Sequence, residues 1–500
     1  MSETALAEQE TSRVEGPLAA LRDRMRLEAG EAAVALRVVY AGAAAYAVLF
    51  VFAAVLHYMV FKEARFDLGN MVQAVWNTGH GHFLDTTSAS GHQGDRLGFH
   101  VDPFLLVFVP IFWIWSSPVL LLVVQALAVT SGVFPVFWLA RKHLDSSRAA
   151  AHFAFAYLLY PATQFNTFTI GDGFHAISLA VPLVLYAVWF LDEDRLLAFS
   201  VLALIAFTTK EEIPLAVGCL GIWYAVRRGR RAFGLSVFAV GLTVTLFNLL
   251  WVIPHFSGSG GSPFADRYRS VGGTPHGMAH KFVTDPVAFA HAIVSVHKAA
   301  YLVVLLVPVL GLWLLEPLLF LGAVPELAID LLSNHGNQTS IGYQYTAGIA
   351  PFVIAASIFG AARFRQQALR LSLGVLVATG LVALISPINR LGHDVRALGS
   401  PLVSAKSHAL SLVPAGVQVS ASNELAGYLS ERRSITIFPS VGRAKWIITD
   451  INDETLSIAG FKRQVRKYET NKAWRIVYSS HGIAVPRKRG GSAVTGSSGG

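Results

Sequence analysis

The chain has 500 residues, of which 53% are hydrophobic and only 14% are charged, with a formal net charge of +9. Soluble domains have about 25% charged residues, so this composition argues against a soluble protein and indicates a polytopic membrane protein. The basic residues lie in short clusters between apolar stretches, which is typical of cytoplasmic loops and argues against nucleic-acid binding. The single cysteine, Cys219, lies in an apolar stretch, which excludes an internal disulfide and a cysteine metal site.

The N-terminal part predicts a tail, a first span and an outer loop. Residues 1–36 are polar and contain several arginines, so we expect a cytoplasmic tail. A first span is predicted at about 38–61, and its basic leading flank places the following loop, 62–118, outside. Within this loop the aromatic-rich segment 103–117 is interrupted by a proline and is predicted to lie as a helix in the membrane interface.

Ten further apolar stretches follow, so we predict about eleven spans within a transmembrane domain at 37–386. Every basic cluster between the spans then lies on one side, as the positive-inside rule requires. The predicted spans are 38–61, 119–140, 149–160, 177–190, 196–208, 213–226, 232–253, 301–315, 317–331, 346–362 and 371–385.

After the last span the hydrophobicity falls and the pattern changes. The pieces VQVSAS, SITIFP, AKWIITD and WRIVYSS have the composition of strands, and NELAGYLSERR that of a helix. We therefore predict a small extracytoplasmic α/β domain at 387–487. The Gly/Ser-rich end, 488–500, is predicted to be a disordered tail.

Several spaced stretches resemble one family of bacterial membrane proteins, the domain of unknown function 2079. They cover about residues 60–480 and occur in the order RFDLGNMVQAVWNTGHGHFL, DRLGFHVDPFLLVFVPIFWIWSSPVLLLVVQALAV, GDGFHAISLAVPLVLYA, TKEE and VSASNELAGYLSERRSITIFP. This family distantly resembles the GT-C glycosyltransferases, which are polytopic enzymes that take sugars from polyprenyl-phosphate carriers on the outer side of the membrane. The resemblance implies a GT-C-like fold with interface helices in the first outer loop.

The resemblance also implies roles for residues at matching positions. Asp67 is placed like the catalytic aspartate that GT-C enzymes have in their first outer loop. Lys210 and Glu211 are placed like the charged corner that several of those enzymes have near the donor phosphate. This chain departs from the family pattern at Leu68, where a paired-acid signature would have a second acid.

The residues themselves support a transfer site in the outer loops. Moving a sugar from a lipid phosphate to a hydroxyl needs a carboxylate base and cations that stabilise the departing phosphate. Asp67 is the candidate base, and the other interpretation is an interface acid that caps a helix. The donor-phosphate candidates are Lys210, Arg96 and Arg269, each of which could instead be a solvated surface charge.

Two His/Asp pairs in outer loops are candidates for a supporting or metal-binding role. His100 with Asp102 and Asp172 with His175 could hold a divalent cation, Mg or Mn, or could orient one another while Asp67 acts as base. The other interpretation is that these polar pairs close the packing between outer loops. Glu211 could join either arrangement.

These observations predict a plasma-membrane glycosyltransferase of the hexosyl- or pentosyltransferase kind. Its donor would be a polyprenyl-phosphate sugar and its acceptor a glycan, lipid or protein on the outer face. The N-terminus would be cytoplasmic and the C-terminus extracytoplasmic. The alternative is a transporter or flippase of a lipid-linked envelope precursor, for which repeated halves and ionisable residues near mid-membrane would be expected.

Overall fold

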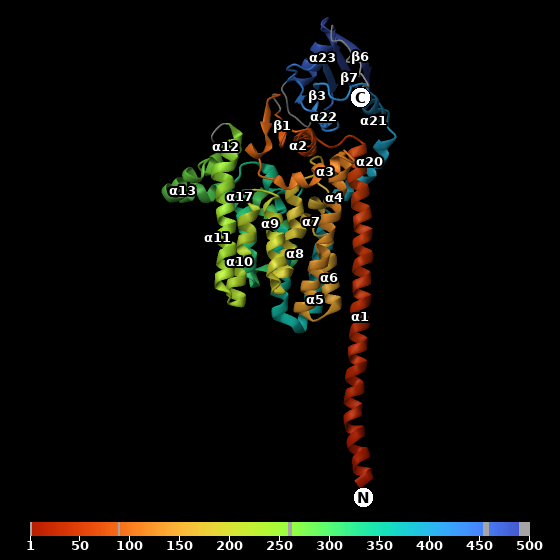
Figure 1. Cartoon of the computed structure of the whole chain (residues 1–500), viewed down its shortest axis with the longest axis vertical. Coiled ribbons are helices and arrows are strands. Elements are labelled where there is room, and N and C mark those ends of the chain that lie inside the picture. The colour runs from red at the N-terminus through yellow and green to blue at the C-terminus, as the bar shows by residue number, and fades with distance from the viewer. Residues whose placement is uncertain (1–2, 89–90, 259–262, 454–459, 490–500) are drawn as a thin grey trace.

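A bundle of helices has a smaller mixed α/β unit at one end (Figure 1). This computed structural model describes residues 3–88, 91–258, 263–453 and 460–489. The C-terminal part of helix α1 (Glu3–Met59) lies along one side of the bundle, and its N-terminal part extends beyond the other helices (Figure 1). The predicted tail, 1–36, is therefore helical from its third residue onward. Most of the predicted disordered tail, 490–500, lies outside the described residues.

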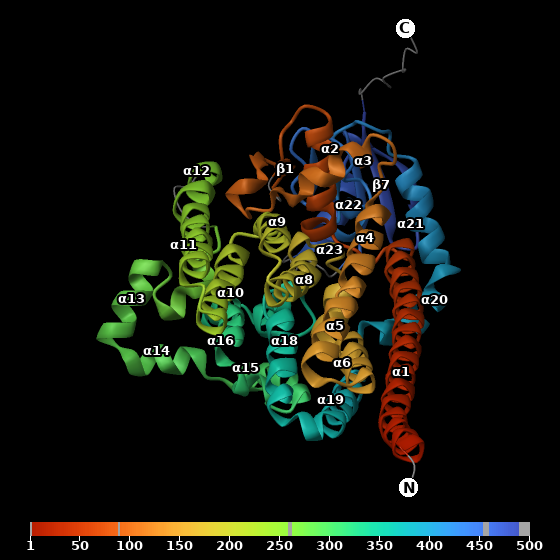
Figure 2. The ribbon, with the colours of Figure 1, turned by 60° about the horizontal axis from the view of Figure 1, so that its bottom comes forward.

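The longer helices form the bundle and are arranged around its core as Figure 2 shows. After α1 they are α4 (Pro118–Ser131), α5 (Val133–Leu144), α6 (Ser147–Leu159), α8 (Ala180–Asp192), α9 (Leu196–Phe207), α10 (Ile213–Arg228), α11 (Arg231–Phe247), α15 (Val296–Leu306), α18 (Ala350–Ala361) and α19 (Ala368–Val382). The shorter helices are α2 (Asn70–Gly79), α3 (Val109–Phe112), α7 (Pro161–Thr167), α12 (Ile253–Ser257), α13 (Pro275–Thr284), α14 (Pro286–Ile293), α16 (Pro317–Phe320) and α17 (Val324–Leu332).

Among the described residues, four helical segments are long and apolar enough to cross a membrane. These segments are Gly30–Met59, Pro118–Leu144, Arg231–Ser257 and Gln344–Leu398. A pair of helices bent by 58°, Pro286–Ile293 and Val296–Val309, would make a fifth span. The chain is thus a polytopic, mostly helical membrane protein. The larger number of spans predicted from the sequence also counts shorter apolar helices such as α8 and α9.

Local sequence signals explain where several helices begin and end. Helix α4 begins with Pro118 in its first turn, and the side chain of Ser117 accepts a hydrogen bond from the backbone N–H of Val119. Helix α10 ends at Gly229, which has a positive φ of 69° and so tolerates the left-handed conformation that closes a helix. These signals confine the turns between spans to short polar segments.

Small residues allow α10 and α11 to pack closely. A Cβ atom on Gly221 would lie 2.2 Å from the carbonyl oxygen of Gly234, and a Cβ atom on Gly234 would lie 2.3 Å from that of Gly221. Only glycine permits this approach of the two backbones. In a membrane such close packing of small residues supplies much of the attraction between helices. This pair of helices therefore forms a rigid wall beside the turn that precedes α10.

The α/β unit is built on one mixed sheet with the strand order β4-β3-β5-β7-β6. Strand β3 pairs in parallel with β4 and β5, whereas β7 pairs antiparallel with β5 and β6. The strands are β3 (Val419–Ala421), β4 (Ile435–Ile437), β5 (Trp446–Asp450), β6 (Trp474–Ser480) and β7 (Ile483–Lys488), and the accompanying helices are α20 (Leu391–Leu398), α21 (Pro401–Ser411), α22 (Asn423–Gly427) and α23 (Phe461–Thr470). The first outer loop adds a two-stranded sheet, β1 (Asp85–Thr87) with β2 (Gln93–Asp95).

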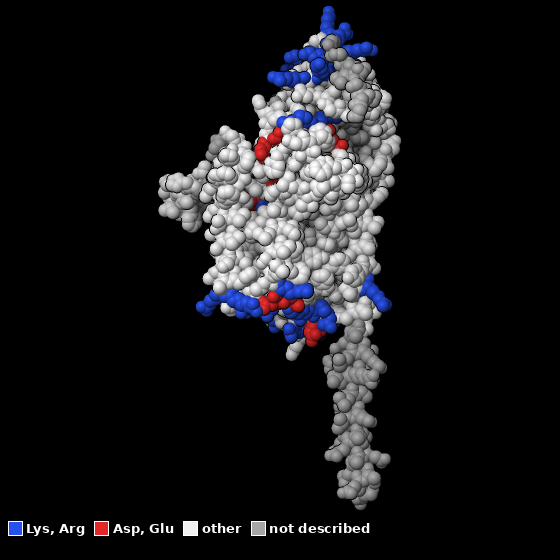
Figure 3. Space-filling view, in the orientation of Figure 1, with Lys and Arg blue, Asp and Glu red and all other residues white. Residues whose placement is uncertain are grey.

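The charged residues on the surface divide along the long axis of the molecule (Figure 3). Lys and Arg gather at the end of the bundle opposite the sheet, and further basic residues lie over the α/β unit. Exposed arginines lie at the ends of helices α10, α11, α18 and α19: Arg227 in the last turn of α10, Arg230 directly before α11, Arg363 just after α18, and Arg370 in the first turn of α19. The bundle between these two ends shows almost no charge in this view. This distribution is that of a protein whose middle section is surrounded by lipid.

One buried lysine, Lys406, joins two helices and the sheet of the α/β unit, and we expect it to stabilise this unit. Lys406 of α21 is 2% exposed. Its Nζ lies 2.8 Å from Oε2 of Glu424 in α22 and 3.0 Å from Oδ2 of Asp450 at the end of β5. Replacing Lys406 by Met leaves two carboxylates without their cation, so it should cost about 3–5 kcal/mol. Pulse proteolysis in urea of the detergent-solubilised protein measures this loss.

The control is Lys472→Met, because Lys472 is exposed. It should change the free energy of unfolding by no more than about 0.5 kcal/mol. Equal effects of the two substitutions would show that the buried ion pairs do not hold the unit together.

Candidate functional site

Asp67 lies in the π-helical turn Arg65–Gly69, which leads from α1 into α2. Two backbone hydrogen bonds hold this turn against the loop between α7 and α8. The N–H of Ala64 donates to the carbonyl oxygen of Gly171, and the N–H of Leu68 donates to that of Asp172, both at 3.1 Å. The two loops are distant in sequence, and these bonds bring their side chains together.

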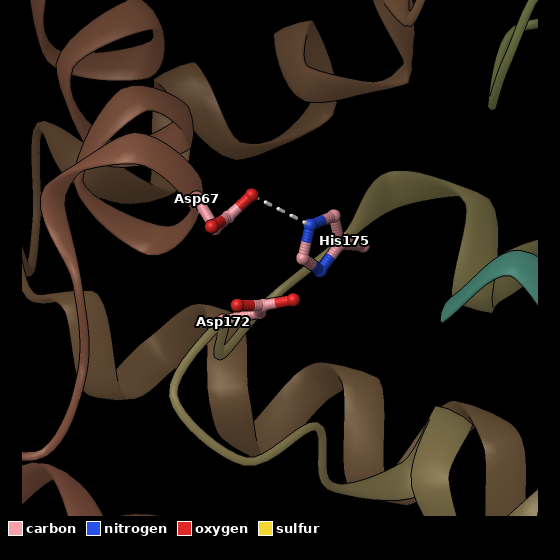
Figure 4. A group of neighbouring side chains, drawn as sticks. All are labelled: Asp67, Asp172 and His175. Atoms are coloured by element: carbon pink, nitrogen blue, oxygen red, sulfur yellow. Dashed lines mark hydrogen bonds and ion pairs between the residues drawn. The ribbon is translucent and has the colours of Figure 1, made fainter. Parts of the chain in front are cut away.

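Asp67, Asp172 and His175 form one group at this junction (Figure 4). Nε2 of His175 lies 3.2 Å from Oδ1 of Asp67, and their side chains are 7% and 32% exposed respectively. Each of the three residues offers one ligand atom, and these atoms all lie within 4.8 Å of one another. The residues could therefore hold a divalent cation with oxygen and nitrogen ligands. Among the described residues no other group of three or more such side chains is this compact.

The carboxyl group of Asp172 lies beside two other carboxyl groups in a poorly solvated place. Burial raises the pKa of Asp172 well above its usual value, and the nearby carboxyl groups of Asp67 and Glu63 raise it further. Two carboxyl groups in contact do not both ionise at neutral pH, because their charges repel in a poorly solvated site. The protonated form of Asp172 is therefore favoured, and the side chain of Asp67 is 32% exposed.

A glutamine in α4 fixes the loop that carries His175. Oε1 of Gln125 accepts a hydrogen bond from the backbone N–H of His175 at 2.7 Å, and its Nε2 donates to the carbonyl oxygen of Gly173 at 3.3 Å. Gln125 is 1% exposed. Sequence reasoning missed this residue, although a single amide within an apolar span is a recognisable signal, because such a group needs buried partners.

A buried polar network holds the other side of the Asp67 turn. The guanidinium of Arg65 is 1% exposed and donates to Asn70, to Gln73 and, at 2.9 Å, to the carbonyl oxygen of Thr87. Burial lowers the pKa of Arg65 to about 9, and the positive charge of Arg96 contributes. This network ties the turn to α2 and β1, and the sequence analysis did not identify it.

The turn between α9 and α10 contributes the opposite wall of the site. Nζ of Lys210 lies 2.7 Å from Oε1 of Glu212. Glu211 accepts hydrogen bonds from Nδ1 of His100 and from the backbone N–H of Val101, both at 2.9 Å. Burial opposes ionisation of Glu211, but His100, Lys210 and the Val101 N–H outweigh it and lower the pKa of Glu211 to about 2. Glu211 thus anchors the first outer loop to this turn as a carboxylate.

Asp102 and His100 are engaged away from the metal-binding group predicted for them. Arg96 binds Asp102 with both Nε and Nη2, at 2.9 and 2.5 Å, and both side chains are buried. His100 is bonded to Glu211. Of the four candidate metal ligands, the structure therefore brings together only Asp172 and His175, and it adds Asp67 to them. Asp102 and His100 do not join this group because Arg96 binds Asp102 and Glu211 binds His100.

The acidic group and the cations face one cavity of about 630 Å³. It is lined by seven of the nine sequence-predicted site residues: Asp67, Arg96, His100, Asp102, Asp172, His175 and Lys210. Glu211 lies behind His100. Arg269 does not line the cavity, because its side chain is 77% exposed and paired with Asp266.

Two further charged residues at the site were missed from the sequence. Arg267 lines the cavity, stacks over the ring of Phe264 at 4.3 Å, and has no ion-pair partner among the described residues. Nothing in the segment ADRYRS distinguishes it from Arg269. Glu63 is fully buried and neither of its carboxyl oxygens has a hydrogen-bond partner. Burial, together with Asp67 and Asp394, raises the pKa of Glu63 well above its usual value and so favours its uncharged form.

Solved structures that are similar to the chain include those of ArnT and of an oligosaccharyltransferase. ArnT from Cupriavidus metallidurans bound to undecaprenyl phosphate has a TM-score of 0.50 and 12% sequence identity, over 88% of this chain and 97% of that one. The apo form of the same ArnT has a TM-score of 0.48 and 14% identity over 89% and 98% of the two chains. An oligosaccharyltransferase from Archaeoglobus fulgidus, in complex with Zn and sulfate, has a TM-score of 0.43 and 15% identity over 88% and 73%.

The likeness to ArnT shows that this chain has a similar fold, in agreement with the GT-C-like fold that the sequence resemblance implies. No curated protein matches the sequence. A family model described as predicted membrane protein (DUF2079) matches residues 57–485, so the resemblance predicted from the sequence is confirmed and the chain belongs to this family.

Proposed function

We propose that the chain is a membrane glycosyltransferase that moves a sugar from a polyprenyl-phosphate carrier to an acceptor on the outer face of the plasma membrane. The observation that carries this proposal is that a carboxylate and cations line one cavity. Asp67, paired with His175, and the cations Lys210 and Arg267 are all part of its lining. Transfer from a lipid phosphate needs both a base and a phosphate-binding group within reach of one sugar.

The fold supports the choice of donor. ArnT, which is similar in fold to this chain, was solved with undecaprenyl phosphate bound. A phosphate carried by a prenyl chain suits a cavity whose lining combines cations with apolar and aromatic side chains, such as Ile177, Phe99 and Phe264. The acceptor is a glycan, lipid or protein that enters from the outer side.

The reaction can be written with the residues of the cavity. Asp67 takes the proton of the acceptor hydroxyl as the hydroxyl oxygen forms a bond to the anomeric carbon of the sugar. The bond between that carbon and the phosphate oxygen breaks, and the phosphate keeps the electron pair. Lys210 and Arg267 stabilise the negative charge that develops on this phosphate. Asp172 and His175 orient Asp67, and a divalent cation held by the three residues would add positive charge beside the phosphate.

The arrangement in the membrane follows from the charges. We infer that the basic end of the bundle is cytoplasmic, so the cavity and the C-terminal unit, 387–487, are extracytoplasmic. The N-terminus is then cytoplasmic, and about eleven spans form the domain 37–386. A transporter or flippase of a lipid-linked precursor is the alternative. It is less favoured because the ionisable residues of the site line one cavity built from the outer loops, whereas transporters usually bind substrates near mid-membrane.

The first prediction about activity compares the roles of the two aspartates of the site. Asp67→Asn removes the base and should lower kcat by about 10²–10⁴-fold. Asp172→Asn keeps a neutral hydrogen-bond donor where a protonated carboxyl stands, so it should lower kcat by less than about tenfold. Sugar transfer from a panel of polyprenyl-phosphate hexoses and pentoses to membrane acceptors measures both.

An equal loss of kcat in the two variants would show that Asp67 is not the base. If the wild-type protein transfers sugar from none of these donors, the transporter class is favoured.

The second prediction concerns the donor phosphate and compares two arginines two residues apart. Arg267→Gln removes an unpaired cation from the cavity and should weaken binding of undecaprenyl phosphate by about 10–100-fold, the effect of one charge-assisted hydrogen bond. Arg269→Gln changes an exposed residue outside the cavity and should leave the Kd within about twofold. Microscale thermophoresis in detergent measures both constants. A larger loss of affinity in Arg269→Gln than in Arg267→Gln would show that Arg269, the arginine predicted from the sequence, binds the phosphate.

A further inference from the structure

The chain changes direction between α1 and the turn that carries Asp67 (Figure 1), and residues 59–63, where it does so, are called the reversal. Helix α1 ends at Met59, and Phe61 adopts a φ of 60°, a left-handed conformation in which a phenylalanine is strained. The N–H groups of residues 60–62 donate to carbonyl oxygens of the last turn of α1, so the helix end is capped locally. The next N–H, that of Glu63, donates to a side chain of the C-terminal unit.

Tyr428, which directly follows α22 in the C-terminal unit, holds the reversal. Its hydroxyl donates to the carbonyl oxygen of Tyr58 at 2.8 Å and accepts from the backbone N–H of Glu63 at 3.2 Å. Its ring contacts the rings of Tyr58 and Phe61, with centroid distances of 4.6 and 4.8 Å. One side chain thus binds the backbone on both sides of the reversal.

The backbone of α22 also lies directly against the Asp67 turn. A Cβ atom on Gly69 would lie 2.6 Å from Oγ of Ser430 and 3.2 Å from Cα of Gly427. A Cβ atom on Gly427 would lie 3.3 Å from the carbonyl carbon of Ala64. Contacts this close leave no space for the turn to shift toward the C-terminal unit.

The same C-terminal segment contacts the cavity wall formed by the first outer loop. Nη1 of Arg433 lies 2.8 Å from Oδ2 of Asp85. The backbone N–H of Ile435 donates to Oγ1 of Thr87 at 3.3 Å, and Thr87 lines the cavity. Residues 427–435 therefore contact the outer loop both at the Asp67 turn and at β1.

We propose that Tyr428 is a positioning residue for Asp67, and that the C-terminal unit is part of the site because it holds the catalytic turn. Without the Tyr428 hydroxyl, the reversal loses a hydrogen bond on each side, and Asp67 leaves its orientation toward His175. The cations Lys210 and Arg267 lie on other elements, so the donor still binds. The kinetic part of this inference rests on the proposed function.

The test compares Tyr428→Phe with Tyr468→Phe in the full-length protein. Each substitution removes one hydroxyl and keeps a ring, and Tyr468 packs within the same unit against Phe438 and Trp474. In Tyr428→Phe the amides of residues 63–69 should exchange with deuterium about tenfold faster or more, while those of β5 keep their protection. The same variant should lose about 10–100-fold in kcat with KM changed by less than about twofold, since misplacement of a catalytic group affects the transition state.

Tyr468→Phe should change neither quantity. Unchanged exchange at residues 63–69 in Tyr428→Phe would overturn the inference, and so would faster exchange with an unchanged kcat. Faster exchange throughout β3 and β5 would also overturn it, because Tyr428 would then stabilise the unit in general. If the wild type transfers no sugar, the proposed function fails, and the exchange measurement still decides whether Tyr428 holds the turn.

Discussion

The structure depends on the contact between two loops that are far apart in sequence, the turn Arg65–Gly69 and the segment that carries Asp172 and His175. Two backbone hydrogen bonds clamp the loops together, and Gln125 fixes one of them from the bundle. The clamp brings the carboxyl groups of Asp67 and Asp172 into a partly buried place beside one cavity. Burial raises the pKa of Asp172, and the neighbouring carboxyl groups raise it further.

The same requirement for partners explains the cations on the other side of the cavity. A charge at the edge of an apolar bundle needs a counter-charge or a ligand, and most charges here have a counter-charge within the chain. Arg96 is bound by Asp102, and Lys210 by Glu212. Arg267 has no such ion-pair partner among the described residues, so it can neutralise a bound phosphate at little cost. The C-terminal unit completes the arrangement because Tyr428 holds the chain where it enters the Asp67 turn.

Much of this organisation could be predicted from the sequence, and the exceptions have physical reasons. The length of the apolar stretches and the basic residues beside them predicted a polytopic protein. The position of Asp67, directly after the first predicted span, made it the candidate base. Strand β7 was missed because it contains Pro486, and a proline normally argues against a strand with partners on both sides. In the structure Pro486 pairs with Ile476, beside an irregularity in the pairing of β6 and β7. Arg267 could not be distinguished from Arg269, because a short 3-10 helix decides which arginine faces the cavity. The partners of Asp102 and His100 depend on tertiary contacts that no spacing reveals.

The most direct test of the account is a cryo-electron microscopy structure of the full-length protein in lipid nanodiscs with undecaprenyl phosphate added. The account predicts phosphate density inside the cavity, within hydrogen-bond distance of Lys210 or Arg267, with the Asp67 carboxylate facing the same space. Phosphate bound at the basic end of the bundle, or a cavity without phosphate at saturating ligand, would contradict the claim that the carboxylate and the cations serve one reaction.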